Sequence, residues 1–326
     1  MNAPSILVLA TGGTIAGQAG SATRRDYRPG QIDIATFLES FAALGVDAPL
    51  VGRQIANIDS SNIGPVIWRD LHDGICRAMD DPAFAGIIVT HGTDTAEETA
   101  FLLDLTLPTT KPVVMVGAMR PADAVGSDGL RNFANAVRVA ADHEAHGRGV
   151  LLVMGDQVLS ARDARKARTS ISGAFEGFPR GPVALANPSS LDWLQPQWRL
   201  GEAARWAFPD DFPRVPILHT YAGQTADSVT RLVEDGARGI VLAGLGEGNS
   251  PHEVRRALAE AAQDGIVVVR SSRVDEGLID REPEDDANRF VAARALGPAK
   301  ARILLQVLLA NGVIDLARVQ EAFNRR

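Results

Sequence analysis

Five polar side chains at expected strand ends belong to types that can take part in covalent or acid–base chemistry: Thr14, Ser60, Thr93, Asp94 and Lys166. A threonine hydroxyl becomes an effective nucleophile when a base removes its proton. A lysine can be that base if burial or neighbouring cations lower its pKa. Thr93, Asp94 and Lys166 therefore offer a hydroxyl, carboxylate and amine set, although the sequence alone does not establish that the three side chains meet.

The first threonine lies in a glycine-rich turn. The apolar run over residues 6–10 is typical of a central parallel strand, and it leads directly into the sequence TGGTIAG at residues 11–17. Two of these glycines have the spacing of a P-loop, but Gln18 stands where the lysine belongs, and the G-x-G-x-x-G pattern is not met. What remains is a strand that ends in glycines, whose backbone N–H groups can approach a ligand, with the hydroxyl of Thr14 among them.

The second threonine lies between an expected strand, residues 86–89, and an expected helix. Thr95 and Glu98 have capping-box spacing, which predicts that the helix starts at Thr95. Thr93 and Asp94 then lie in the turn, at the carboxyl end of a strand, where α/β sheets bind their ligands. Both side chains could instead be simple helix caps, and that interpretation would be preferred if this stretch stood alone.

Several other kinds of site are disfavoured. The six histidines are scattered, so no metal site is expected, and His91 is expected to pack beneath its strand end. The sequence has no G-x-S-x-G elbow of a serine hydrolase, and Cys76 is the only cysteine, which excludes an intrachain disulfide. The net charge of −7, from 33 basic and 40 acidic residues without a basic cluster, disfavours a nucleic acid partner. No apolar run reaches about 18 residues, so no membrane span is expected.

The alternation of strand-like and helix-like segments predicts an α/β protein with two domains. The larger N-terminal domain is expected to be a doubly wound, mostly parallel sheet, and the smaller C-terminal domain is expected to be a second α/β unit. A non-periodic stretch over residues 190–213, with three tryptophans and three prolines, marks the connector. We therefore predict an N-terminal catalytic domain over residues 1–195, a linker over 196–213 and a C-terminal domain over 214–326.

Further elements follow from the same patterns. Pro65 fits the first position of a helix, and a helix over residues 128–146 is expected to end at Gly147. Ser250 and Glu253 have capping-box spacing and should open another helix. The remaining expected elements are helices at residues 32–44 and 225–235, strands at 49–55, 111–116, 149–154, 215–221, 239–244 and 266–270, and two helices at the end of the chain.

Two stretches resemble the signature sequences of the bacterial-type L-asparaginases: residues 9–17, LATGGTIAG, and residues 90–99, THGTDTAEET. Residues 111–121, 241–249 and 267–274 match this family as well, so the resemblance covers nearly the whole chain. The two threonine signatures together are highly specific. The sequence is most similar to the high-affinity type, which is usually exported to the periplasm.

The resemblance implies a hydrolase that releases ammonia from L-asparagine to give L-aspartate, without a cofactor. By motif, Thr14 is the nucleophile that forms an acyl-enzyme, and Tyr27, on a loop of the length used for lids, is hydrogen-bonded to it. Thr93 orients the attacking water or assists the hydroxyl chemistry, with Lys166 as its base. The order in which the two threonines act, and the base that each uses, stay open.

The resemblance also assigns the groups that hold the substrate. Asp94 would pair with the α-ammonium, Ser60 would hold the α-carboxylate, and backbone N–H groups near Thr93, with Ala118 nearby, would form an oxyanion hole. The family usually has glutamine or glutamate at the position of Ser61, so contact with the ammonium departs from the family here. We therefore expect a strong preference for asparagine with weak glutaminase activity, and a glutaminase-asparaginase is the alternative.

The family also implies an assembly. Asn249 and Glu282 match positions that reach the active site of a neighbouring subunit, so the resemblance implies a homotetramer built from two intimate dimers. The family has an acidic residue at the position matched by Glu282. This chain is one residue shorter than the family before that position, which makes Glu284 a second candidate for the acidic residue. Glu282 is preferred.

The first residues of the chain bear on where the protein works. Residues 1–5 lead straight into the first expected strand and leave no room for a signal peptide. A cytoplasmic location is therefore expected, or a periplasmic one if a leader has been removed. The alternative from a different functional class is a two-domain protein that only binds a small molecule, which would have no need of two threonines and a lysine.

Overall fold

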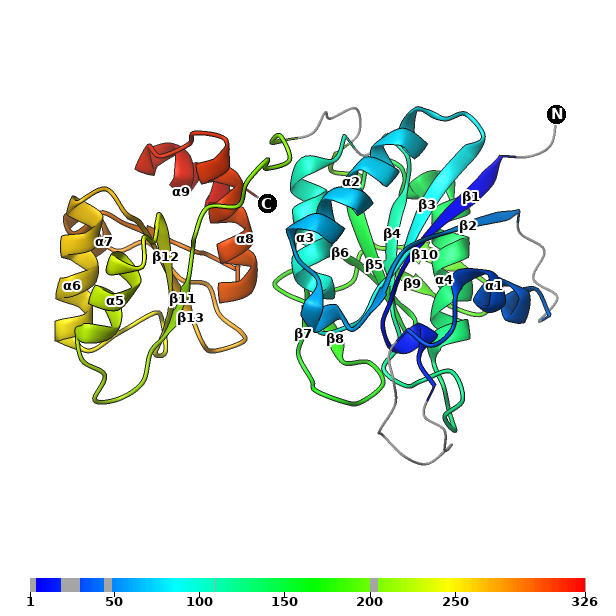
Figure 1. The fold of residues 1–326 in the computed structure, drawn as a ribbon, viewed down its shortest axis with the longest axis horizontal. Coiled ribbons are helices and arrows are strands. Elements are labelled where there is room, and N and C mark those ends of the chain that lie inside the picture. The colour runs from blue at the N-terminus through cyan, green and yellow to red at the C-terminus, as the bar shows by residue number, and fades with distance from the viewer. Residues whose placement is uncertain (1–3, 19–29, 44–48, 109, 200–204, 326) are drawn as a thin grey trace. The chain divides into compact units, whose positions relative to one another are not determined.

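The computed structural model describes residues 4–18, 30–43, 49–108, 110–199 and 205–325. The chain divides into two compact units, Met1–Arg205 and Trp206–Arg326, both drawn in Figure 1. Each unit has a sheet of its own, so each is described by itself.

The N-terminal unit is built on one large sheet. Its strands are β1 (Ser5–Gly12), β2 (Leu50–Ile58), β3 (Phe84–Thr90), β4 (Val113–Val116), β5 (Val150–Met154), β6 (Gln157–Ser160), β9 (Ala184–Ala186) and β10 (Leu191–Trp193). They form an eight-stranded sheet in the order β10-β9-β6-β5-β4-β3-β1-β2. Neighbours are parallel from β2 to β5 and antiparallel beyond β5, so the predicted mostly parallel sheet is confirmed. A separate antiparallel pair consists of β7 (Ala164–Lys166) and β8 (Phe175–Gly177).

Helices cover both faces of this sheet: α1 (Ile34–Ala42), α2 (Pro65–Asp80), α3 (Ala96–Thr106) and α4 (Gly129–Ala141). Successive residues of a strand point to opposite faces. Leu7 and Leu9 of β1 accordingly share a buried cluster with α2 and α3, while Ile6 and Val8 share the other cluster with α1 and α4. Figure 1 shows the two helix layers. Burial on both faces explains why the sequence of β1 is a continuous apolar run.

The start of α3 differs from its prediction. Thr95 is the N-cap residue, but its side chain makes no capping hydrogen bond. Its hydroxyl donates instead to the carbonyl oxygen of Ser60 at 2.8 Å. The predicted capping box with Glu98 is therefore wrong, because a partner distant in the chain takes the hydroxyl.

The end of α4 also differs from its prediction. The helix ends at Ala141 and not at Gly147. Asp142 has an extended backbone, and its carboxylate accepts the N–H of Glu144 at 2.7 Å. Asp142 thereby opens a separate 3-10 turn, η3 (His143–Ala145), before the glycine is reached.

The C-terminal unit confirms the predicted second α/β domain. Its strands are β11 (Ile217–His219), β12 (Gly239–Gly244), β13 (Val267–Ser272) and β14 (Phe290–Ala292). They form a parallel sheet in that order. Its helices are α5 (Asp227–Glu234), α6 (His252–Gln263), α7 (Pro283–Asn288), α8 (Pro298–Ala310) and α9 (Leu316–Asn324). We did not predict β14 and α7, because a three-residue strand and a short acidic helix carry too little periodicity to detect.

The capping box predicted for α6 is wrong. The helix begins at His252, its N-cap residue is Pro251, and no side chain caps it. The Ser250 hydroxyl is buried and has no hydrogen-bond partner within the described residues. Pro251 thus takes the N-cap position at which the capping box would have placed Ser250, which takes the serine out of reach of the first free N–H groups.

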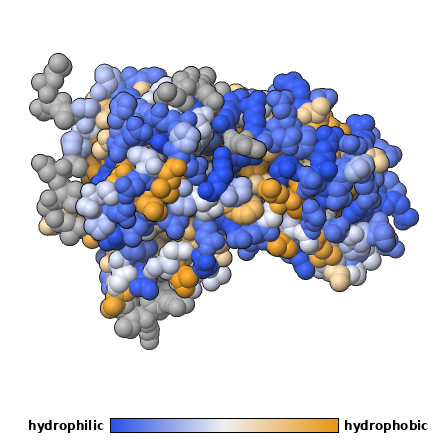
Figure 2. Space-filling view, turned by 180° about the vertical axis from the view of Figure 1, so that it is seen from behind, coloured by the Kyte–Doolittle hydropathy of each residue, from blue (hydrophilic) through white to orange (hydrophobic). Residues whose placement is uncertain are grey.

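The face shown in Figure 2 is mainly hydrophilic, with hydrophobic residues in separate groups. In the described part of the chain, no helix is both long enough and apolar enough to cross a membrane.

Candidate active site

Three backbone segments meet at the carboxyl ends of the central strands. Gly13 follows β1, Gly92 follows β3, and Ser60 begins the 3-10 turn η2 (Ser60–Asn62) after β2. A Cβ atom on Gly13 would lie 2.4 Å from the Cα of Gly92, and one on Gly92 would lie 2.6 Å from the Ser60 hydroxyl oxygen. Both positions require glycine for this close approach. The packing brings both threonine turns to one pocket, lined by Gly13, Thr14, Asp59, Ser60, Gly92, Thr93 and Asp94.

Thr14 lies at the start of the 3-10 turn η1 (Thr14–Ala16) that follows β1. The φ angle of 78° at Gly13 lies in the left-handed region, which turns the chain sharply before the threonine. Thr14 and Thr93 are each only 5 % exposed, so both hydroxyls lie below the surface. Tyr27, the expected lid residue, lies outside the described residues.

Lys166 joins the second threonine to the carboxylate beside it. Its Nζ atom donates to Thr93 Oγ1 at 2.9 Å and to Asp94 Oδ1 at 2.5 Å. The Lys166 side chain is 17 % exposed and that of Asp94 is 61 % exposed. An ammonium group only donates, so Thr93 accepts this bond and its own proton is available to another group. When the amine is neutral, it can accept the Thr93 proton through the same contact.

The hairpin that carries Lys166 is fastened at two points. The Lys166 N–H donates to the Glu97 carboxylate at 3.2 Å, which ties β7 to the first turn of α3. The buried Asp163 carboxylate accepts two hydrogen bonds from Arg180, at 2.6 and 3.0 Å. The lysine could be predicted from the sequence but neither support could, because each support joins residues that are far apart in the chain or separated by a loop.

Ser60 is held by two hydrogen bonds to the turn after β3. Its hydroxyl accepts the Asp94 N–H at 3.2 Å, and its carbonyl accepts the Thr95 hydroxyl at 2.8 Å. Ser60 is 3 % exposed. The two proposed substrate-binding residues, Ser60 and Asp94, are therefore fixed relative to each other.

Ser61 is exposed, and its hydroxyl is directed to Asp59. The Ser61 hydroxyl and N–H both donate to Asp59 Oδ1, at 2.8 and 2.9 Å. Asp59 lines the pocket together with Asp94, so two acidic residues border the same space. Sequence analysis missed Asp59, because an aspartate before serines is a common local cap. Its position directly before Ser60, the serine expected to bind the substrate, is the feature that could have revealed it.

His91 is fully buried at the end of β3, as predicted. Its Nδ1 lies 2.6 Å from the Gly92 carbonyl oxygen, and its Nε2 lies 3.0 Å from the Thr99 hydroxyl oxygen. Burial lowers the pKa of His91 from 6.5 to about 4, so the ring is neutral near pH 7. Within the described residues, no group of three or more histidine, cysteine, aspartate or glutamate side chains could hold a metal ion.

Two family profiles match consecutive parts of the chain. The profile described as "Asparaginase, N-terminal" matches residues 5–199, and the profile described as "Glutaminase/Asparaginase C-terminal domain" matches residues 214–323. The chain belongs to the asparaginase family.

The alignments with known asparaginases extend over almost the whole of this chain. L-asparaginase 2 of Escherichia coli is 40% identical over 328 residues, which are 99% of this chain and 93% of the relative. The probable periplasmic L-asparaginase of Haemophilus influenzae is 40% identical over 94% of this chain and 88% of its own length. A glutaminase-asparaginase of Pseudomonas aeruginosa is 36% identical over 94% of this chain and 86% of its own length.

A solved structure of an asparaginase has the same fold. The probable cytoplasmic L-asparaginase from Campylobacter jejuni superimposes with a TM-score of 0.92 at 34% sequence identity. The match covers 99% of this chain and 100% of that chain. The predicted two-domain fold and the family resemblance are therefore confirmed together.

The asparaginase resemblance also named residues of the C-terminal unit. Arg255 donates to Asn249 Oδ1 at 3.2 Å and to Glu284 Oε2 at 2.5 Å. Its hydrogen bond and positive charge hold the pKa of Glu284 below the usual value of a glutamate. Glu282 is the N-cap residue of α7, and its N–H donates to Asp285 at 2.9 Å. Of the two candidate acids, Glu284 is thus already paired with an arginine.

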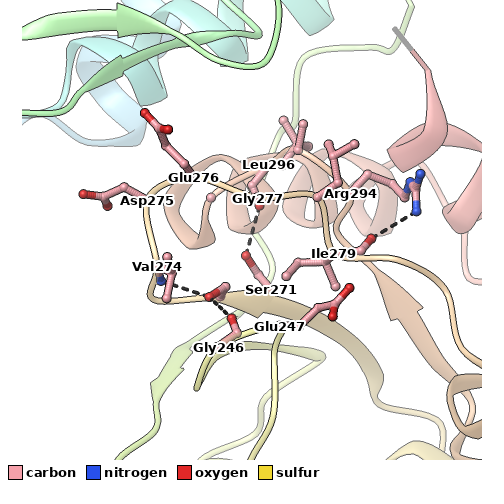
Figure 3. A pocket seen from close by; sticks show the side chains of 14 residues that line it. Gly246, Glu247, Ser271, Val274, Asp275, Glu276, Gly277, Ile279, Arg294 and Leu296 are labelled. Atoms are coloured by element: carbon pink, nitrogen blue, oxygen red, sulfur yellow. Dashed lines mark hydrogen bonds between the residues drawn. The ribbon is translucent and has the colours of Figure 1, made fainter.

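The C-terminal unit of this asparaginase contains a larger pocket of about 270 Å³. Figure 3 shows the Ser271 hydroxyl directed to a backbone carbonyl. Ser271 donates to Leu296 at 2.9 Å, and Ser272 donates to Gly246 at 2.5 Å. The described residues that line it include no lysine or histidine, so this pocket offers its serines no basic nitrogen of the kind that Lys166 provides.

Proposed function

We propose that this asparaginase-family protein hydrolyses L-asparagine to L-aspartate and ammonia without a cofactor. The observation that carries the proposal is the 2.9 Å hydrogen bond from Lys166 to Thr93, in a pocket that Thr14 also lines. A hydroxyl paired with an amine beside a second hydroxyl suits amide hydrolysis through a covalent intermediate. A protein that only binds a small molecule has no need of this set.

In the proposed reaction, Thr14 is the nucleophile. Its hydroxyl oxygen forms a bond to the side-chain amide carbon of asparagine, and the carbon–nitrogen bond breaks. The proton that the Thr14 hydroxyl loses is passed to the nitrogen, which leaves as ammonia. Water then adds to the ester carbonyl, and the ester bond breaks to give L-aspartate and a protonated Thr14 hydroxyl. Thr93 orients this water, and Lys166 is the proposed base for the proton that the water or Thr93 gives up. Tyr27 is proposed to assist Thr14.

The amino-acid end of the substrate is proposed to bind at Ser60 and Asp94. Ser60 is buried and held by two hydrogen bonds, which suits a fixed contact with the α-carboxylate. The Asp94 carboxylate is largely exposed and can pair with the α-ammonium. Because Ser61 is shorter than glutamine or glutamate, glutamine is proposed to be a weak substrate. The glutaminase-asparaginase relative makes higher glutaminase activity the alternative.

The proposed assembly is a homotetramer of two intimate dimers, in which Asn249 and Glu282 reach the active site of a neighbouring subunit. The ion pair between Arg255 and Glu284 supports Glu282 as the acidic residue of that contact. Light scattering is expected to give the mass of a tetramer. A fully active monomer would refute the proposed assembly.

The location is proposed to be cytoplasmic, as stated in the name of the Campylobacter jejuni protein. The Haemophilus influenzae relative is named as periplasmic, which is the alternative. Fractionation of the source cells distinguishes the two, because the protein should remain with the cytoplasmic fraction after release of the periplasm.

The decisive experiment measures ammonia release from asparagine and from glutamine side by side. Rapid release from asparagine and slow release from glutamine are expected. Similar kcat/KM values for both substrates would favour the glutaminase-asparaginase alternative. Binding of either amino acid without ammonia release would refute the enzyme and favour the binding protein.

A further inference from the structure

One peptide unit at the pocket, between Gly92 and Thr93, has its carbonyl end held by a buried side chain. The Gly92 carbonyl oxygen lies 2.6 Å from Nδ1 of His91. The C=O and the N–H of a trans peptide unit point in opposite directions, so the Thr93 N–H faces away from His91. Gly92 and Thr93 both line the pocket, and the Thr93 N–H has no hydrogen-bond acceptor within the described residues.

A chain of hydrogen bonds determines which nitrogen of His91 carries the proton. The Trp68 indole N–H donates to Thr99 Oγ1 at 2.9 Å. The Gly92 carbonyl oxygen can only accept, so Nδ1 of the neutral ring carries the proton. Thr99 Oγ1 lies 3.0 Å from the remaining nitrogen, Nε2, which therefore accepts the proton of the Thr99 hydroxyl. Nε2 is then the unprotonated nitrogen, and Nδ1 donates to Gly92. The burial that lowers the pKa of His91 to about 4 keeps the ring in this neutral form near pH 7.

A second peptide unit, between Gly117 and Ala118 after β4, is held in the same way. The Asn132 side chain on α4 donates to the Gly117 carbonyl at 2.9 Å, and it accepts the Gly155 N–H at 3.0 Å. The amide is therefore fixed at both ends. Ala118 is fully buried, and its N–H lacks an acceptor among the residues that the structure describes. A Cβ on Gly117 would lie 3.2 Å from the Thr93 methyl carbon, so this peptide unit is close to the second threonine.

We propose that His91 and Asn132 are positioning residues that aim the N–H groups of Thr93 and Ala118 at the reacting oxygen of the substrate. This inference rests on the proposed hydrolysis of asparagine, in which that oxygen becomes negatively charged when Thr14 attacks. Buried N–H groups without acceptors are rare in folded proteins, and a developing oxyanion gives these two a partner. Preorganised donors act most strongly in the transition state, so their orientation controls kcat more than substrate binding.

The role of His91 is tested by substituting Thr99, which does not line the pocket. Thr99→Val removes the hydroxyl that donates to Nε2 of His91 and supports this tautomer, and it keeps the shape of the side chain. We expect kcat for asparagine to fall about tenfold to a hundredfold with KM within about twofold, because loss of one oxyanion donor costs on the order of 10²–10³ in kcat. Thr99→Ser restores the hydroxyl and should recover most of the lost rate.

A matched control lies two turns along the same helix. Thr106 is also buried on α3, but its hydroxyl donates within the helix, to Leu102 at 2.8 Å. Thr106→Val should therefore leave kcat unchanged. A fall in kcat equal to that of Thr99→Val would mean that any buried hydroxyl of α3 matters, and would overturn the specific role of the His91 chain.

The role of Asn132 is tested by comparing a variant of Asn132 with a variant of Asn135. Asn132→Leu removes the donor to Gly117 and should lower kcat by a similar factor. Asn135 lies one turn further on α4, is 6 % exposed, and donates to the Gly155 carbonyl at 2.9 Å. Asn135→Leu should change kcat less than twofold. L-aspartate binding, measured by calorimetry, should persist in each variant and show that the pocket is folded.

A spectroscopic measurement separates positioning from a general loss of structure. In ¹⁵N-histidine-labelled wild-type protein, His91 should give the signals of a neutral ring protonated at Nδ1 between about pH 5 and pH 8. The Nε2 signal should shift in Thr99→Val, which removes its hydrogen bond, and should return toward the wild-type position in Thr99→Ser. A ring protonated at Nε2 in the wild type would overturn the inference.

The kinetic outcomes distinguish this inference from the proposed function. If the wild type hydrolyses asparagine but Thr99→Val and Asn132→Leu keep wild-type kcat, or change KM alone, the positioning role is overturned and the proposed function stands. If the wild type releases no ammonia from asparagine, the proposed function itself fails, and the positioning role fails with it.

Discussion

Lys166 and Thr93 are 73 residues apart in the chain, and a 2.9 Å hydrogen bond joins their side chains. The contact depends on a short hairpin that is fastened to α3 through Glu97. Thr93 itself is placed by the glycine contacts at the ends of β1 and β3. A hydroxyl and an amine from two separate segments are therefore held at the separation that proton transfer requires.

Removing either member of this pair should nearly abolish turnover. Lys166→Met and Thr93→Val should each lower kcat by about 10²–10⁴-fold, the usual effect of losing a positioned base. The double variant should be little worse than either single one, because the two groups act as a unit. Steady-state ammonia release measures all three, and multiplicative losses in the double variant would show that the residues act independently.

Thr14→Ala should be at least as damaging, because it removes the proposed covalent nucleophile. We expect a loss of several orders of magnitude in kcat, about 4 kcal/mol or more in activation free energy, with L-aspartate binding largely intact. Mass spectrometry after mixing with asparagine should detect no acyl-enzyme in this variant. Retention of a tenth of the wild-type activity would show that Thr14 is not the nucleophile.

Thr95→Val should weaken substrate binding more than it slows the reaction. The Thr95 hydroxyl holds the Ser60 carbonyl at 2.8 Å and does not cap its own helix. Its loss should let the proposed α-carboxylate site relax, at a cost of about 1 kcal/mol for one hydrogen bond. KM for asparagine should rise about fivefold with a smaller change in kcat, and Thr95→Ser should restore it. An unchanged KM, with only a lower thermal stability, would show that the hydroxyl has a structural role alone.

The central strands of the N-terminal sheet, β1, β3, β4 and β5, could be predicted because they are buried on both faces. Such strands are continuous apolar runs in the sequence, and β1 and β3 lie where those runs are. The three-residue strand β14 and the acidic helix α7 could not be predicted in this way. β14 is stabilised by pairing with β13, which leaves no local pattern. α7 does carry local signals, a capping box between Glu282 and Asp285 with a proline at its first position, but it is too short to show an apolar period.

The site was predictable only in part, for a related reason. The types of Thr14, Thr93 and Lys166 are visible in the sequence, and the family motifs name them. Their partners are not visible, because the Thr95 hydroxyl could cap its own helix or reach Ser60 with equal ease on paper. Tertiary packing favours the distant partner, so the local capping rule fails at the turn proposed to bind the substrate.

His91 should make stability depend on pH. Its pKa is lowered from 6.5 to about 4 in the folded protein by burial. Below pH 6.5 the unfolded chain binds a proton on this histidine that the folded chain rejects, so the free energy of unfolding should fall as the pH drops from about 6.5 to about 4. The contribution of the neutral His91 to the free energy of unfolding is fully present above that pH range. Its loss below the range lowers the free energy of unfolding by about 3 kcal/mol.

A variant without the imidazole isolates this contribution. Denaturant unfolding of the wild type and of His91→Gln should be compared at about pH 4.5 and about pH 7. A glutamine side chain does not titrate, so the wild type should lose about 2 to 3 kcal/mol relative to the variant at the lower pH. An equal difference between the two proteins at both pH values would contradict a buried, neutral His91.

Ser61→Gln should raise the activity toward glutamine relative to asparagine. The Ser61 hydroxyl donates to Asp59 at 2.8 Å, so in the wild type it is engaged within its own turn. A glutamine side chain at this position is long enough to reach the substrate ammonium beside Asp94. Firmer anchoring of the amino-acid end should help most with glutamine, whose extra methylene displaces its amide relative to Thr14.

The comparison of kcat/KM for both substrates decides this prediction. The ratio of glutamine to asparagine activity should increase about threefold to tenfold in Ser61→Gln, which corresponds to about one hydrogen bond of net stabilisation. Ser61→Ala is the matched control, because it removes the hydroxyl bond to Asp59 without adding a group that reaches the substrate. An equal rise in Ser61→Ala would assign the effect to a released Asp59 carboxylate, and an unchanged or lower ratio in Ser61→Gln would show that position 61 does not set the choice of substrate.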